Sequence, residues 1–72
     1  MLDYTDAGKK GQFIRIEERS WAKGFGEAFI FDGEIEHLLI GGDYDGNFLV
    51  LFTDQDGHGM GTAVPRDEFI FA

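Results

Sequence analysis

The sequence contains no cysteine, a single proline and no long apolar run. Without cysteine the chain can form neither a disulfide nor a thiolate metal site, and this absence is typical of a reducing compartment. No apolar run approaches the roughly 20 residues that a membrane-spanning helix needs, and the acidic N-terminus lacks the pattern of a secretory signal. We therefore expect a cytoplasmic protein with no membrane partner.

Glycine and phenylalanine are abundant, with eleven and eight residues among the 72. Glycine favours turns over helix interiors, whereas each phenylalanine buries a large apolar area. A chain of this length forms one domain and buries only about 60% of its unfolded surface. We expect a flexible N-terminal segment over residues 1–8 and a single small β-barrel domain of the all-β class over residues 9–72.

The charge is strongly asymmetric. The formal net charge is −8. Residues 1–24 hold five cations and four acids, a net charge of +1, whereas residues 25–72 hold Arg66 alone against ten acids, a net charge of −9. An acidic surface repels nucleic acid at long range and attracts basic partners. The balance therefore favours a basic protein partner over nucleic acid.

Three Asp-Gly pairs, at residues 32–33, 45–46 and 56–57, divide the chain. Asp-Gly is the strongest short signal for a tight hairpin turn with positive φ. The pattern predicts an antiparallel meander, and Pro65 with the polar step after it predicts a 3₁₀ turn before the last strand. The expected strands are residues 12–17, 26–31, 34–40, 47–53, 60–64 and 69–71. The run 47–53 is apolar on both faces, which is typical of a central strand.

The order of these elements resembles the SH3-like small β-barrel superfold. The string Lys9-Lys10-Gly11-Gln12-Phe13-Ile14-Arg15-Ile16 is similar to its diverging turn and following strand. Val64-Pro65, a short polar step and then Phe69-Ile70 are similar to its ending. The resemblance implies a five- to six-stranded antiparallel barrel. Trp21 does not match the spacing of the peptide-binding members, so no polyproline site is carried over, and the superfold hosts too many functions to supply one.

A second resemblance is to cold-shock domains, which are OB-fold barrels that bind single-stranded nucleic acid. Lys23-Gly24-Phe25-Gly26 is similar to a string of that family, which stacks bases on aromatic side chains. The next aromatic position of the family is Glu27 here, and the long third loop is missing. An OB-fold is therefore the alternative fold, and single-strand binding is the alternative function. The residues that would carry it are Arg15, Trp21, Lys23, Phe25 and His37.

An aromatic patch is the main candidate site. If Ala28 and Ile30 face the core, the phenylalanines at 25, 29 and 31 share the opposite face. Aromatic side chains anchor protein interfaces, and carboxylates around them orient a basic partner. The main hypothesis is a non-enzymatic acidic module that docks on a basic or nucleic-acid-binding protein, in one form as an inhibitor that blocks its nucleic-acid surface. The predicted protein-binding residues are Trp21, Phe25, Glu27, Phe29, Phe31, Glu34 and Glu36.

Self-association is a third hypothesis, because an exposed final strand at residues 69–71 would invite edge pairing or a symmetric homodimer.

The remaining motifs predict no enzyme, cofactor or metal site. Residues 54–59 match the opening of a calcium loop, but the twelfth position is Pro65 instead of a bidentate glutamate. Turn formation explains these aspartates without a metal. His37 and His58 have no predictable catalytic partner.

Overall fold

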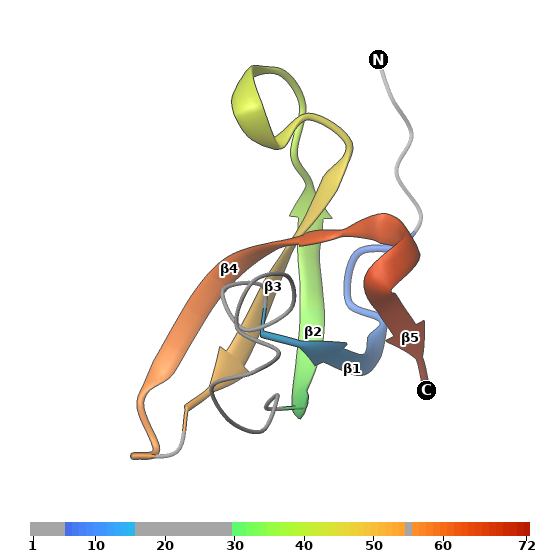
Figure 1. Ribbon diagram of the computed structural model, residues 1–72. Helices are drawn as coiled ribbons and strands as arrows, with labels where there is room; N and C mark the ends of the chain where they lie inside the picture. Colours follow the sequence, from blue (N-terminus) through green and yellow to red (C-terminus); the bar gives the residue numbers. More distant parts are fainter. Residues whose placement is uncertain (1–5, 16–29, 55) are drawn as a thin grey trace, which may run out of the picture.

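The computed structural model describes residues 6–15, 30–54 and 56–72, and these form one sheet of five antiparallel strands. Figure 1 shows the strands and two short 3₁₀ helices in chain order. The elements are β1 (Lys10–Ile14), β2 (Ile30–Leu38), η3 (Gly42–Tyr44), β3 (Asn47–Thr53), β4 (Gly59–Pro65), η4 (Arg66–Glu68) and β5 (Phe69–Phe71). The predicted all-β class is confirmed, as is the 3₁₀ turn before the last strand.

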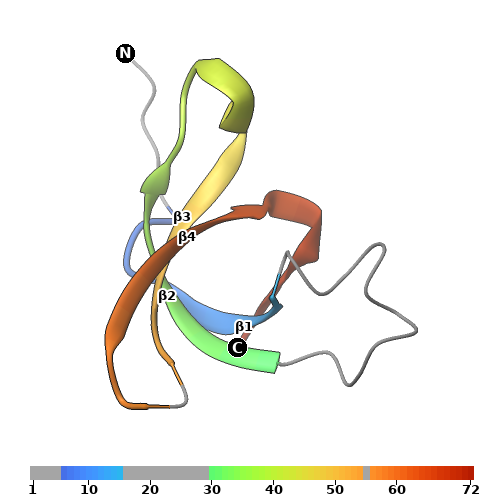
Figure 2. The same cartoon turned by 60° about the vertical axis from the view of Figure 1, so that its left-hand side comes forward.

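The strand order in the sheet is β4-β3-β2-β1-β5. Strands β2, β3 and β4 form the predicted meander, and β1 pairs with both β2 and β5. Among the described residues the sheet is open, because β4 and β5 are its edges and are not paired with each other. In Figure 2 the sheet curves strongly, and η4 carries the chain from β4 across to β5.

One predicted hairpin is wrong. Residues 26–31 and 34–40 were expected to form two strands joined by a turn at Asp32-Gly33, but Ile30–Leu38 is one continuous strand. Gly33 is needed there for space, because a Cβ would lie 2.3 Å from Val50 Cγ1 and 3.0 Å from Phe13 Cε1. A glycine inside a strand can mark a close approach as well as a turn.

The other two Asp-Gly pairs do form turns. Gly46 and Gly57 have φ values of 83° and 85°, in the region that glycine adopts at least cost. Gly46 ends the β2–β3 connection, which projects beyond the sheet at the top of Figures 1 and 2. Gly57 lies in the tight turn between β3 and β4. The strands around these turns are close to those predicted from the sequence.

The core lies on the concave side of the sheet and contains only apolar side chains among the described residues. Phe13, Phe31 and Phe52 form one ring cluster, with centroids 4.8–5.5 Å apart. Phe48, Phe69 and Phe71 form a second, with centroids 5.2–6.1 Å apart. Since β3 contributes to both clusters, the two halves of the sheet pack on a common interior. The buried residues are Phe13, Phe31, Ile35, Phe48, Val50, Val64 and Phe69.

Neither of the two described helices has the length or apolar character needed to cross a bilayer.

Candidate protein-interaction surface

The convex side of the sheet carries large aliphatic side chains that water can reach. Ile30 on β2, Leu51 on β3 and Ile70 on β5 are 66%, 44% and 65% exposed. Their immediate neighbours in sequence, such as Phe31, Val50 and Phe69, are buried. Side chains alternate between the two faces along a strand. The alternation that turns the buried residues toward the core therefore turns these aliphatic residues toward water. We define the outward face as Lys10, Gln12, Ile30, Asp32, Glu34, Leu51 and Ile70.

The register aligns the outward face in cross-strand rows. Lys10 lies opposite Glu34, which lies opposite Leu51, and Leu51 lies opposite Gly61 on the edge strand. This row crosses four strands from β1 to β4. Neighbouring strands are about 4.8 Å apart, so the row spans about 14 Å. It therefore combines a cation, a carboxylate and an aliphatic side chain on one line of the surface.

A second row on the outward face is more polar. Ile70 lies opposite Gln12, and Gln12 lies opposite Asp32. Gln12 donates a hydrogen bond from Nε2 to Oδ1 of Asp32 over 2.9 Å. This bond fixes one carboxylate oxygen of Asp32 beside Gln12, one strand away from the exposed Ile70, and leaves the second oxygen available to a cation. The row thus holds an oriented acid and an apolar group on the same face, with Gln12 between them.

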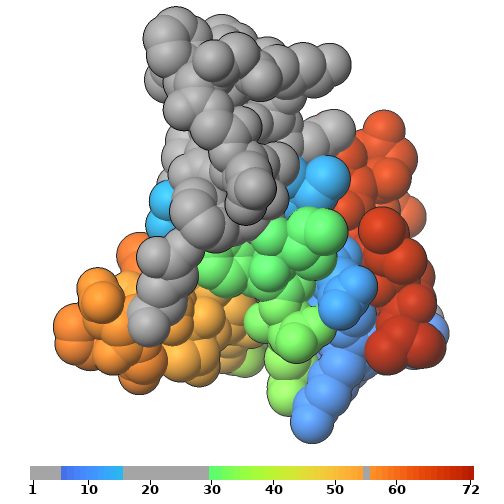
Figure 3. All heavy atoms as spheres, turned by 60° about the horizontal axis from the view of Figure 1, so that its bottom comes forward, coloured from blue at the N-terminus to red at the C-terminus, as the bar shows by residue number. Residues whose placement is uncertain are grey.

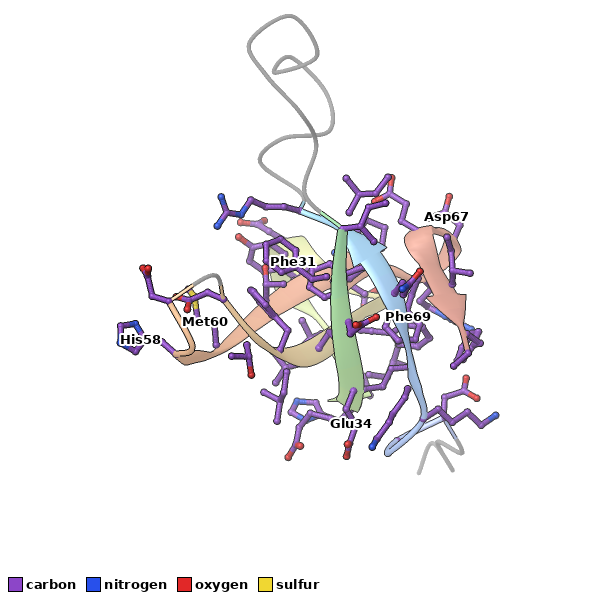
Figure 4. All side chains as sticks on the ribbon, turned by 90° about the horizontal axis from the view of Figure 1, so that it is seen from below. Phe31, Glu34, His58, Met60, Asp67 and Phe69 are labelled. Carbon is purple, nitrogen blue, oxygen red and sulfur yellow. The ribbon has the colours of Figure 1, made fainter. Side chains whose placement is uncertain are left out.

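Two shallow hollows meet on the outward face. One extends toward β5 and the other toward β4, and both are lined by Glu34, Leu51, Phe52 and Thr53. Glu34 is labelled in Figure 4, on β2 near the middle of the sheet. In Figure 3, β2 (green) lies between β1 and β5 (blue and red) on one side and the β3–β4 hairpin (orange) on the other. Glu34 and Leu51 therefore occupy the centre of a continuous surface.

Carboxylates dominate the charge around this face. The described residues hold ten acids against Lys9, Lys10, Arg15 and Arg66. Asp32, Glu34 and Glu36 are exposed on β2 itself. The remaining acids lie in the turns and connections at the ends of the strands. These carboxylates would therefore attract a positively charged surface both at the centre of the outward face and around it.

One of the predicted anchors is not on the surface. Phe31 was expected to be exposed while Ile30 faced the core, and the structure shows the reverse: Phe31 is 7% exposed and Ile30 is 66% exposed. The reason is that Phe31 lies opposite Phe13 on β1, with the two rings stacked 5.5 Å apart. Phe13 itself is 1% exposed.

The other predicted binding residues divide into two groups. Glu34 and Glu36 are exposed on β2, Glu34 at the centre of the outward face and not at its rim, and the role of both in binding stays a prediction. Trp21, Phe25, Glu27 and Phe29 lie outside the described residues, and so does Lys23 of the nucleic-acid set. The aliphatic centre of the outward face was not predicted, because the run 47–53 is apolar on both faces and its alternation does not show which face is exposed.

The described members of the nucleic-acid set lie far apart. Arg15 follows Ile14, which pairs with Ile30 at one end of β2, whereas His37 pairs with Leu49 near the other end. Seven residues of strand separate these ends, or about 23 Å. The Arg15 guanidinium carbon also lies 5.4 Å from the centroid of the Phe31 ring, a cation–π contact. These two side chains therefore do not form one compact basic patch.

The acidic turn at residues 54–58 has a structural role. Asp54 Oδ1 accepts hydrogen bonds from the backbone N–H groups of Asp56 and His58, at 2.9 and 2.8 Å. Aspartate commonly stabilises turns in this way. Ligand atoms of Asp54, Asp56 and His58 lie within 4.8 Å of one another, but exposed acids often gather without a metal. The turn bonds account for Asp54, and nothing else at this position points to an ion.

Comparisons with protein-family models, curated proteins and solved structures found no match to this chain.

Proposed function

We propose that the protein is a non-enzymatic, acidic binding module of the cytoplasm that docks on a basic protein through its outward face. The observation that carries the proposal is that Ile30, Leu51 and Ile70 share one face of the sheet and remain 44–66% exposed. Aliphatic groups surrounded by charge are the usual composition of a non-obligate interface, with an apolar centre and a polar rim.

Charge gives this surface a preferred partner. The outward face presents Asp32 and Glu34 beside the aliphatic groups, and the whole chain carries a net charge of −8. Complementary potentials accelerate encounter and fix orientation. A partner with an apolar patch bordered by lysine and arginine fits this surface. Nucleic-acid-binding proteins carry such basic surfaces, so a module of this kind could occupy one and act as an inhibitor.

The element order supports the SH3-like resemblance without deciding the function. A long segment separates β1 from β2, a meander follows, and a 3₁₀ turn precedes the last strand. We propose an SH3-like barrel as the complete fold. Small barrels of this type support many binding functions, so the choice of partner rests on the outward face alone.

Paired lysine substitutions test the proposal. Leu51→Lys places a cation at the centre of the outward face, whereas Ile40→Lys changes an aliphatic residue that is 68% exposed outside this face. A basic protein captured by the wild type should bind Leu51→Lys at least about tenfold more weakly, because a central apolar contact is lost and a like charge is gained. Ile40→Lys should bind normally, and circular dichroism should show both variants folded.

Equal binding by the wild type and Leu51→Lys would contradict this assignment. The nucleic-acid alternative has its own readout, because Trp21 is the only tryptophan of the chain. Single-stranded oligonucleotides at low salt should leave its fluorescence unchanged. Strong quenching that weakens as salt is added would favour nucleic acid instead.

A further inference from the structure

The edge strand β4 has an unusual composition for an exposed edge. It runs for seven residues, Gly59–Pro65, and contains no charged side chain. Edge strands normally resist pairing with other chains through charge, bulges or short length. The opposite edge, β5, has only three residues. Within the described part of the chain, β4 is therefore the edge that is least protected against a further strand.

The backbone of β4 presents its free hydrogen-bonding groups at three small residues. Asp54 N–H donates to His58 O over 2.9 Å, which makes residues 54 and 58 a hydrogen-bonded pair. Bonded and non-bonded pairs alternate along an antiparallel ladder. The pairs Thr53–Gly59, Leu51–Gly61 and Leu49–Ala63 are therefore non-bonded. The N–H and C=O groups of Gly59, Gly61 and Ala63 consequently point away from β3 and toward the open edge.

Pro65 agrees with this alternation. It lies opposite Asn47 in the next non-bonded pair, where its missing N–H costs the ladder nothing. A Cβ on Gly59 would meet no atom within 4 Å, so the face of the sheet at this end of β4 is also open. Among the described residues no strand pairs with this edge, so an approaching strand would meet the outward backbone groups from Gly59 to Ala63, and Pro65 would limit the pairing at one end.

We propose that a second copy of this chain pairs with β4 antiparallel, with the twofold axis at Gly61. In this register Gly61 faces Gly61 of the second copy, and Gly59 faces Ala63 of the second copy. Each of the three resulting bonded pairs exchanges two hydrogen bonds, which gives six. In any other antiparallel register that pairs these outward groups with each other, at least one of the three residues in each copy has no hydrogen-bonding partner. The strand is thus complementary to itself, as a twofold interface requires.

The charges at the two ends of β4 favour the same register. The twofold register brings the turn with exposed Asp56 of one copy toward exposed Arg66, which follows β4 in the other copy, once at each end of the interface. Figure 4 shows that the turn with His58 and the segment with Asp67 lie at opposite ends of β4. The Debye length of about 8 Å at physiological salt screens most of the remaining acid–acid repulsion. The pairing of all three outward residues and the opposite charges at the two ends are what favour a second copy over an unrelated strand.

Disulfide cross-linking tests the register, because the natural chain has no cysteine. Gly61→Cys introduces one thiol beside the twofold axis, where the two Cα atoms would be about 5.5 Å apart, within disulfide range. Gly59→Cys is the matched control, since its two copies would lie about 14 Å apart along the paired strands. Mild oxidation should rapidly dimerise Gly61→Cys and leave Gly59→Cys monomeric. Equal cross-linking of both variants, or of Gly59→Cys alone, would overturn the register.

Charge reversal provides the second test. Asp56→Arg and Arg66→Asp should each weaken dimerisation about tenfold, because each replaces attraction by repulsion at both ends. The double variant restores opposite charges and should recover wild-type dimerisation. Sedimentation across a dilution series measures each constant. A wild type that stays monomeric up to about 1 mM, or a double variant that remains weakened, would overturn the proposal. Open-ended assembly would overturn it too, because it requires a heterologous contact instead of a twofold one.

Discussion

The two faces of the sheet are made by the same strands but differ in composition: one is wholly apolar, and the other mixes aliphatic and charged side chains. On the concave face, seven apolar side chains are buried, and no polar side chain of the described residues is buried with them. On the convex face, aliphatic residues stand beside Lys10, Asp32 and Glu34. Because side chains alternate along each strand, those on the concave face are buried and stabilise the fold, whereas those on the convex face remain exposed and can contact a partner. The comparison predicts that equivalent substitutions on the two faces have very different costs.

Two isoleucines of β2 give the largest expected contrast. Ile35 is 1% exposed and Ile30 is 66% exposed. Ile35→Ala should destabilise the fold by about 2–5 kcal/mol, because it removes buried methyl groups and leaves a cavity. Ile30→Ala should change the free energy of unfolding by about 0.5 kcal/mol or less. Urea denaturation followed by circular dichroism measures both values. Similar losses in the two variants would mean that the faces are not distinct.

A pair of glycines tests the tightness of the concave face. Gly33→Ala places a Cβ within 2.3 Å of Val50 and 3.0 Å of Phe13, so side chains and backbone must move. We expect a loss of about 1–3 kcal/mol, typical of overpacking. Gly59→Ala meets open space at the edge of the sheet and should be nearly neutral. Chemical denaturation gives both free energies, and a neutral Gly33→Ala would show that the glycine is not required for space.

The smallest expected effect concerns the turn that fixes the β3–β4 register, and so the faces themselves. Asp54→Ala removes the acceptor of two backbone N–H bonds and should cost about 1 kcal/mol. Asp43→Ala is the control, because the described residues offer the Asp43 side chain no hydrogen-bond partner. Thermal unfolding of the two variants at equal ionic strength separates the turn bonds from the loss of a charge. Equal shifts in Tm would assign the effect to charge alone.

Much of the fold could be predicted because its signals are local. The apolar run 47–53, the Asp-Gly turn at 56–57 and the 3₁₀ step after Pro65 each follow from residues close together in the chain. The hairpin predicted at Asp32-Gly33 is wrong for the opposite reason, because it depends on residues far apart in the chain. Its glycine makes room for Val50 and Phe13, which are distant in sequence, and the sequence does not distinguish this need from a positive φ.

The candidate site was harder to predict because it depends on the phase of one strand. Placing β2 one residue out of phase turned Phe31 outward and Ile30 inward, which exchanged core and surface. The stacking of Phe31 on Phe13 fixes the true phase, and that contact joins two strands separated by a long segment. The acidic residues Glu34 and Glu36 were placed on the surface because charge alone indicates exposure.

The irregular pairing of β2 also governs how this chain can vary in length. Ile35 pairs with Val50 and His37 pairs with Leu49, so Glu36 is an extra residue that faces no partner. Residues 32, 34 and 38 would share one face of a regular strand. Asp32 and Glu34 point outward, but Leu38, beyond the extra residue, turns inward and packs against the core. Deleting Glu36 would make the ladder continuous and leave every later side chain on its present side. The bulge is thus a site where one residue could be lost during evolution without turning the strand inside out.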